Sequence, residues 1–211
     1  TLTHNATTNN LPGAANITTA AGDRAVYESD GTTVYCSSYT KASGLPVVSA
    51  SAGFTLGTPV ATTSGLSVDI TGIPATVRQL IVNLKGVGID AGTDLLIQLG
   101  DSGGIETSGY VSVGMQLQSG SSVTALASTS GFLCKLSSST QELTGCMTFN
   151  LENSSTNSWS GVGGFVRSDA PNQGYVSTGG KSLSATLDRI RLTTISGTAN
   201  FDAGEVNISY I

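Results

Sequence analysis

Apolar and polar residues alternate with a period of two through most of this chain of 211 residues. Leu66, Val68 and Ile70, for example, alternate with Ser67 and Asp69. Turn-forming residues, chiefly Gly, Pro, Asn, Asp, Ser and Thr, interrupt the pattern about every eight to twelve positions. Since successive side chains of a strand point to opposite faces, this pattern predicts short strands with one apolar face. A helical period is nearly absent, so we expect an all-β protein.

Residues 66–211 carry the strongest form of this pattern. A hairpin is expected within Gly131–Leu151, where two apolar segments flank a polar one. About ten strands in a segment of this length favour two packed antiparallel sheets, so residues 66–211 are predicted to form a jelly-roll-like β-sandwich head domain. The other expected strands lie at residues 66–71, 80–84, 95–99, 111–117, 123–127, 158–167, 173–178, 187–195 and 205–211.

Residues 1–43 are different, because their strand candidates are short and contain few apolar residues. Asp30-Gly31 lies between Ala25–Ser29 and Thr32–Tyr39, which predicts a β-hairpin with a two-residue type I′ turn. The segment has too little apolar mass to enclose a core alone. We therefore expect a small β module that acts as an oligomerising collar.

Residues 44–65 contain two prolines and many small residues. This composition is typical of a linker, since proline and glycine interrupt regular structure. We interpret the segment as a connector, with a possible edge strand around Phe54–Val60. The clearest domain boundary is expected near residues 44–52.

Charged residues are scarce, at 11% of the chain, whereas hydrophobic residues make up 38%. The apolar fraction is sufficient for a packed core, so the composition argues against disorder. The nine Lys and Arg residues are scattered and the formal net charge is −5, which argues against nucleic acid as a partner. No run of 18 apolar residues is present, so no membrane insertion is expected.

Three cysteines, Cys36, Cys134 and Cys146, show no metal-ligand spacing. Cys134 and Cys146 could face each other across the expected hairpin, but the alternation assigns Cys134 to the apolar face and Cys146 to the polar one. A disulfide requires side chains that point toward each other. Reduced thiols are therefore favoured over a Cys134–Cys146 pair, in keeping with folding in a reducing cytoplasm.

His4 is the single histidine. A catalytic triad based on histidine, or a metal site with several histidines, therefore cannot form within one chain. The string GDSGG around Ser102 resembles the nucleophile segment of chymotrypsin-type proteases, but only His4 is present as a base and the surrounding protease pattern is missing. We interpret this resemblance as accidental.

The densest acidic cluster comprises Asp90, Asp94, Asp101 and Glu106. Asp101 and Glu106 lie in the glycine-rich segment LGDSGGIETSGY, where they could bind a sugar hydroxyl or Ca²⁺. The EF-hand pattern is absent, and a turn capped by the side chain of Asp101 is the favoured interpretation. Catalysis by a carboxylate pair is the weakest of these options, so no enzyme activity and no cofactor are expected.

Aromatic residues in expected loops give a second set of candidates. Trp159 lies among small polar residues, and Tyr110 and Tyr175 each lie next to a glycine. Such rings could stack on the C–H face of a sugar or could close the end of the sandwich. Together with Asp101 and Glu106, these three aromatic residues form the predicted receptor-binding or glycan-binding set.

Arg189 and Arg191 fall on the polar face of an expected strand near the C-terminus. If that strand forms a hairpin with the last one, Glu205 lies opposite the arginines. We expect cross-strand ion pairs there, each contributing a few tenths of a kcal/mol.

Several segments resemble appendage proteins of tailed bacteriophages. The first lies in residues 1–43, in the phrases LTHNAT and LPGAANITTAAGD followed by a Cys-containing strand. The others, which look like the C-terminal domains of tail fibres, are GFTLGTPVATTSGLSVDITGIPA, LLIQLGDSGGIETSGY and KSLSATLDRIRLTTISGTANFDAGEVNISYI. Together these segments cover about half of the chain, and none of them carries a catalytic motif.

This resemblance implies a homotrimer in which small N-terminal modules surround a shared axis and β-sandwich heads lie at the tip. It implies a non-enzymatic virion protein, made in the host cytoplasm, that contacts other virion proteins and a host surface glycan or protein. The distal part of a tail fibre or spike is the first expectation. A capsid-bound head fibre or decoration protein is the alternative, and a polysaccharide depolymerase fragment is a weaker one.

Overall fold

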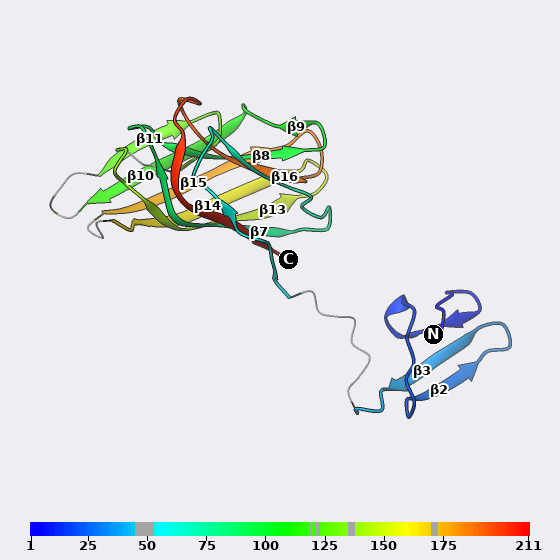
Figure 1. The fold of residues 1–211 in the computed structure, drawn as a ribbon. Helices are drawn as coiled ribbons and strands as arrows, with labels where there is room; N and C mark the ends of the chain where they lie inside the picture. The colour runs from blue at the N-terminus through cyan, green and yellow to red at the C-terminus, as the bar shows by residue number, and fades with distance from the viewer. Residues whose placement is uncertain (45–52, 119, 121–122, 135–137, 170–172) are drawn as a thin grey trace. The chain divides into compact units, whose positions relative to one another are not determined.

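The computed structural model describes residues 1–44, 53–118, 120, 123–134, 138–169 and 173–211. The chain divides into two compact units, Thr1–Gly53 and Phe54–Ile211. In the described residues, regular structure consists of β-strands and one short 3₁₀ turn, η1 (Pro12–Ala14), so the all-β prediction is confirmed (Figure 1).

The N-terminal unit contains a three-stranded sheet in the order β1-β3-β2. Its core is small: the buried apolar side chains that pack together are Leu11, Ile17, Cys36 and Tyr39, with Leu2 partly buried against them. The strands are β1 (Asn9–Asn10), β2 (Arg24–Ser29) and β3 (Val34–Thr40).

The β2–β3 hairpin confirms the predicted pairing but not the predicted turn. Ser29 pairs with Val34, so the loop is the four residues Asp30–Thr33 instead of a two-residue turn. The Asp30 carboxylate explains the difference, because its Oδ1 accepts hydrogen bonds from the backbone N–H groups of Thr32 and Thr33 at 2.9 and 2.7 Å. An aspartate that binds the loop backbone in this way stabilises a wider turn than the Asp-Gly pair alone predicts.

The C-terminal unit contains two larger sheets. A nine-stranded sheet has the order β11-β10-β15-β14-β13-β7-β17-β4, with β5 also paired to β17. A five-stranded sheet has the order β12-β8-β16-β6, with β9 paired to β8. The strands are β4 (Thr55–Leu56), β5 (Val60–Ala61), β6 (Val68–Thr71), β7 (Gln79–Ile89), β8 (Leu95–Asp101), β9 (Gly104–Ile105), β10 (Tyr110–Gln118), β11 (Thr124–Ser128), β12 (Phe132–Cys134), β13 (Leu143–Asn153), β14 (Ser158–Arg167), β15 (Gln173–Ser182), β16 (Arg189–Thr194) and β17 (Phe201–Tyr210).

The two sheets share one hydrophobic core, which is the arrangement of a β-sandwich (Figure 1). Leu80 and Val82 of β7 are fully buried, as the alternation predicts, and Ile97 of β8 is buried in the same core. Phe132 of β12 meets Phe149 of β13 edge to face, with ring centroids 4.9 Å apart. Aromatic pairs in this geometry stabilise a core beyond the area that they bury.

Strand β10 forms as expected, but its bulky apolar residues face outward. Tyr110 and Ser112 are buried, whereas Val111 is 77% exposed. The alternation in Val111–Leu117 correctly predicts a strand but does not reveal which face packs, because Tyr110 and small residues form its inner face.

The expected hairpin within Gly131–Leu151 does not form. Strand β12 pairs with β8 in the five-stranded sheet, whereas β13 pairs with β14 and β7 in the nine-stranded sheet. The chain crosses between the sheets at this point. Cys134 is buried and Cys146 is exposed, and both are free thiols.

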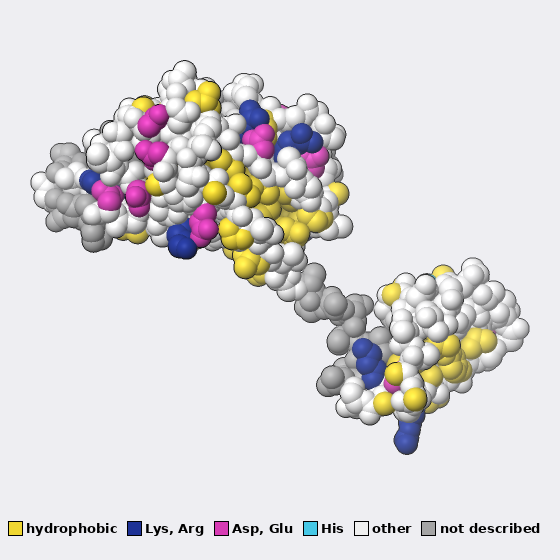
Figure 2. All heavy atoms as spheres, in the orientation of Figure 1, with side chains coloured by type: hydrophobic (Ala, Val, Ile, Leu, Met, Phe, Trp, Pro, Cys, Tyr) yellow, Lys and Arg dark blue, Asp and Glu magenta, His cyan; other side chains and the backbone are white. Residues whose placement is uncertain are grey.

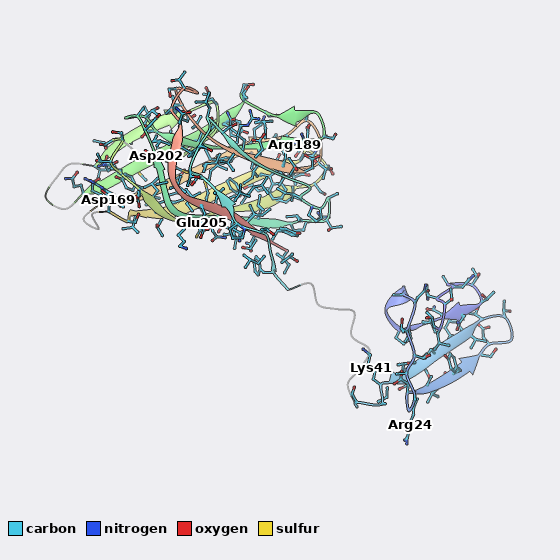
Figure 3. The ribbon with its side chains drawn as sticks, in the orientation of Figure 1. Arg24, Lys41, Asp169, Arg189, Asp202 and Glu205 are labelled. Atoms are coloured by element: carbon cyan, nitrogen blue, oxygen red, sulfur yellow. The ribbon has the colours of Figure 1, made fainter. Side chains whose placement is uncertain are left out.

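The expected pairing of Arg189 and Arg191 with Glu205 is also wrong. Strands β16 and β17 belong to different sheets, and Figure 3 shows Arg189 and Glu205 apart on the sandwich. Instead, Arg189 forms an ion pair with Asp188, Arg191 with Asp69, and Glu205 with Lys85. Figure 2 shows acidic and basic side chains in small groups on a largely uncharged face of the molecule.

Residues 54–65, assigned to the connector in the sequence, include two short strands of the C-terminal unit. Strand β4 pairs with the end of β17, where Leu56 lies opposite Ser209. Strand β5 pairs further back along β17, where Val60 lies opposite Val206. The first and last strands of the C-terminal unit are therefore hydrogen-bonded to each other.

Candidate binding site at one end of the sandwich

The acidic loop after β8 begins with a tight turn at Asp101. Its Oδ1 accepts a hydrogen bond from the backbone N–H of Gly103 at 2.8 Å, as the predicted capped turn requires. Its Oδ2 accepts one from the Ser184 hydroxyl at 2.6 Å. The bond from Ser184 is the main reason that the pKa of Asp101 lies below its ordinary value, because hydrogen bonds to a carboxylate favour its charged form.

Glu106 extends the same network. Its Oε1 accepts a hydrogen bond from the backbone N–H of Ser184 at 2.7 Å, and its other oxygen forms an ion pair with Lys181. Partial burial acts to raise the pKa of Glu106, but the hydrogen bonds from Lys181 and Ser184 outweigh it, so the pKa is lowered. Both predicted acids therefore hold Ser184 and join the loop after β8 to the segment after β15.

Tyr110 lies beneath this network. Its hydroxyl accepts a hydrogen bond from the backbone N–H of Leu99 at 2.8 Å and donates to the backbone carbonyl of Glu106 at 2.8 Å. The Lys181 ammonium lies 5.3 Å from the centre of the Tyr110 ring, within the range of a cation–π contact. Burial raises the pKa of this phenol.

Trp159 lies close to the same group through the strand register. Lys181 on β15 is opposite Tyr110 on one side and Trp159 on the other. Trp159 is only 2% exposed, so its ring has no open face on which a sugar could stack. In this fold Trp159 belongs to the core at the end of the sandwich.

Tyr175, the fifth predicted residue, lies elsewhere. It is on β15 six positions before Lys181, and its hydroxyl donates to Gln173 Oε1 at 2.7 Å. It is also buried, and burial raises its pKa. The structure thus brings Asp101, Glu106, Tyr110 and Trp159 together and leaves Tyr175 apart.

Sequence reasoning missed two residues that organise this site, Lys181 and Ser184. Lys181 is almost covered and contacts Glu106 and Tyr110, and Ser184 binds both acids. No local spacing marks them, since they depend on the pairing of β15 with β10 and β14. The one sequence signal for Lys181 is that it is the single charged residue of the glycine-rich segment GYVSTGGKS.

The acids of this region are engaged in structural hydrogen bonds. Asp101 and Glu106 meet at Ser184, so they do not flank an open cleft of the kind that a glycosidase requires. Asp90 binds Asn200 through two hydrogen bonds of 2.8 and 2.9 Å. Within the described segments, His, Cys, Asp and Glu side chains nowhere form a group of three able to hold a metal ion.

Trp159 lines two hollows. The first, with a volume of about 140 Å³, is lined by Ala75, Val77, Arg78, Leu151, Ser154, Asn157, Trp159, Thr186 and Leu187. The second, of about 260 Å³, is shallower and is lined by Gly109, Val111, Glu152, Ser158, Trp159, Gly180, Lys181 and Ser182. The first hollow is therefore framed by residues before β7, by the β13–β14 hairpin and by residues before β16.

No protein-family model matches this chain, and no curated protein sequence matches it. In the part of the chain that the structure describes, no helix has the length and apolar character needed to cross a membrane.

Proposed function

We propose that this chain is a non-enzymatic structural and adhesive protein of a virus particle, the distal part of a trimeric phage tail fibre or spike. One observation carries the proposal: the β2–β3 hairpin of the N-terminal unit leaves large apolar side chains uncovered. Val26 is 56% exposed and Tyr27 is 41% exposed, and Val34 and Tyr35, on opposite faces of β3, are also exposed. Figure 2 shows hydrophobic side chains gathered over this hairpin.

A neighbouring copy of the chain would cover this surface. Fully burying a side chain of this size contributes about 1.5–3 kcal/mol. These side chains are 37–56% exposed, so covering those on one face of the hairpin would gain part of that amount for a unit with so small a core. Contiguous exposed apolar surface marks interaction sites in soluble proteins. The sequence resemblance to phage appendage proteins supports three copies, with a jelly-roll-like sandwich as the head of each.

The heads would supply attachment to a host surface glycan or protein. Contacts that are weak singly become strong when one particle presents several copies at once. The carboxylates of the sandwich end are occupied by Ser184 and Lys181, which supports a binding role over a hydrolytic one. The free thiols suit synthesis in the reducing cytoplasm of a host.

A capsid-bound head fibre or decoration protein is the second candidate. It is favoured by the outward face of the nine-stranded sheet, where Val111, Leu117, Val162 and Val166 are exposed. An exposed apolar sheet face suits packing against a protein shell. Labelling intact particles with an antibody against residues 66–211 separates the two candidates, because a label on the shell alone would reject the tail location.

Light scattering of residues 1–211 tests the trimer. We expect three copies per particle in solution, and we expect the double substitution Val26→Ser, Tyr35→Ser to dissociate them. Val162→Ser, an equally exposed valine of the C-terminal unit, is the matched control. A wild-type chain that stays monomeric at micromolar concentration would reject the oligomeric collar.

A further inference from the structure

Trp159, which lines the smaller hollow, carries an unsatisfied donor. Trp159 lines the hollow and is 2% exposed, and its indole Nε1–H has no hydrogen-bond acceptor in the described part of the chain. Buried polar groups are normally paired, so an orphan of this kind calls for an explanation. An acceptor oxygen, from a bound water or from a ligand that reaches the nitrogen, would satisfy this N–H.

Arg78 is a second unusual group in the same hollow. Its guanidinium Nη1 donates to the backbone carbonyls of Val77 at 3.2 Å and Ala75 at 3.4 Å, while no carboxylate of a described residue lies within 4 Å of it. Among the described residues of the C-terminal unit, the other Lys and Arg side chains each form an ion pair: Lys85, Arg167, Lys181, Arg189 and Arg191. Among the described cations of this unit, Arg78 is therefore the one without an ion pair, and it is available for an external anion.

The remaining lining is uncharged. Ser154, Asn157 and Thr186 offer polar side chains, and Val77, Leu151 and Leu187 offer apolar surface. The nearby Glu152 lines the other hollow and is absent from the lining of this one.

Asn157 has a backbone φ of 48°, which is uncommon for a residue with a side chain, and its carbonyl accepts a hydrogen bond from Leu183. The hairpin that frames the hollow is thus fixed to the segment after β15.

We propose that this hollow binds the carboxylate of an acidic sugar residue. Arg78 would pair with the carboxylate, the Trp159 indole N–H would donate to a ligand oxygen, and the apolar residues would contact the C–H face of the ring. A volume of about 140 Å³ lies below the range of pockets that take drug-sized ligands, so it suits a single sugar residue. This inference rests on the proposed attachment role and names the ligand class, a glycan with exposed uronic-type residues.

Trp159 is the single tryptophan of the chain, so its fluorescence and its indole N–H resonance report on a ligand in either hollow that it lines. Arg78 lines the smaller hollow alone of the two, so the Arg78 variant below assigns the response to that hollow. The experiment titrates the full chain with glucuronate, with glucose as the neutral analogue and with acetate as the carboxylate alone. We expect a saturable change with glucuronate at millimolar concentration, and at least tenfold weaker responses to glucose and acetate. An equal response to glucose, or no saturable response to glucuronate, would overturn the proposal.

Arg78→Gln is expected to weaken glucuronate binding about tenfold or more, which corresponds to loss of a charge-assisted hydrogen bond. Arg191→Gln, which removes a cation already paired with Asp69, is the matched control and is expected to leave the affinity unchanged. Trp159→Phe keeps an aromatic ring but removes the N–H donor, and we expect this variant to bind glucuronate more weakly. Because the variant has no tryptophan, its binding is measured from the NMR resonances of glucuronate. Thermal unfolding of each variant establishes that the fold is intact, and unchanged affinity in a folded Arg78→Gln chain would reject the site.

Failure of this experiment can be distinguished from failure of the proposed function. Particle labelling tests the location of the protein, and glucuronate binding tests the hollow. A chain that binds glucuronate but is missing from virus particles would retain this site and reject the attachment role. A chain found on the tail that does not bind glucuronate would retain the tail location and reject this site.

Discussion

The two units of this chain are built from similar strands but bury their apolar side chains very differently. In the C-terminal unit, alternate residues of two sheets face each other, and side chains such as Leu80, Ile97 and Phe149 are completely buried. In the N-terminal unit every residue of β2 is exposed. The comparison shows that alternation creates an apolar face but that only a second layer turns this face into a core.

Separating the two units tests most directly whether each one can fold without the other. Residues 54–211 are expected to unfold cooperatively on their own, with the same midpoint as the C-terminal unit of the full chain. Residues 1–53 as a monomer are expected to show no cooperative unfolding, because the four side chains of their core bury too little area. Circular dichroism during thermal unfolding measures both, and a cooperative monomeric transition in residues 1–53 would contradict the difference.

The core of the sandwich can be broken by one truncation. Phe149→Ala is expected to lower the free energy of unfolding of the C-terminal unit by about 3–5 kcal/mol, since it opens a cavity against Phe132. Val162→Ala on the adjacent strand β14 is the control, with an expected change within about 0.5 kcal/mol because its side chain is largely exposed. Urea unfolding monitored by fluorescence of Trp159 gives both values, and equal effects would refute the assignment of faces.

A glycine of β17 gives the next largest effect. Gly204 has a φ of 88°, and a Cβ there would lie 2.3 Å from the carbonyl oxygen of Gly86 on β7. Gly204→Ala should therefore cost about 3 kcal/mol, from both the backbone strain and the collision. Gly197→Ala has a similar φ of 65° but open space, so only the strain, about 1 kcal/mol, is expected. Unfolding midpoints in urea compare the two, and equal losses would show that the β7–β17 contact is looser than described.

The smallest effect concerns pH and is restricted to the sandwich end. The Ser184 hydrogen bond lowers the pKa of Asp101 below 3.8, so its stabilisation is present above that pH and is lost as the pH falls through the lower, folded value. At pH 7, Asp101→Asn is expected to cost about 1 kcal/mol, and the difference from wild type should shrink toward pH 3.

The exposed Asp202 on β17, labelled in Figure 3, provides the matched Asp→Asn control. Asp202→Asn should change stability at pH 7 by less than about 0.5 kcal/mol. Unfolding free energies of the wild type and both variants, measured between pH 3 and 7, test this pH dependence. A constant difference between wild type and Asp101→Asn over that range would contradict the assigned cause.

Local pattern was sufficient to predict most strands and the all-β class. Ser158–Arg167 was predicted with the bounds that β14 has, and Val206 and Ile208 are buried as expected. The failures concern partners: β12 was expected to pair with β13, and β16 with β17. Strands of both sheets show the same alternation, so the sequence does not indicate to which sheet a strand belongs.

In the candidate site, too, the sequence predicts local features but not which strands are neighbours. The capped turn at Asp101 is a local feature, and the sequence predicts it. The convergence of Tyr110 and Trp159 on Lys181 requires that β10, β15 and β14 be neighbours in register, which no spacing along the chain encodes. Arg78 was overlooked because its distinguishing property, the lack of a described acidic partner, appears only when the other ion pairs are known.

The pairing of β4 and β5 with β17 has a mechanical consequence. Tension applied through the N-terminal unit enters the sandwich at β4, which shares two residue pairs with β17, and then reaches β5, which shares two more. These short ladders should open before the long β7–β17 ladder, releasing Thr55–Ala61 as slack of about 24 Å at roughly 3.4 Å per residue. Under tension, the C-terminal unit would thus release a short segment of chain reversibly while its core stays folded.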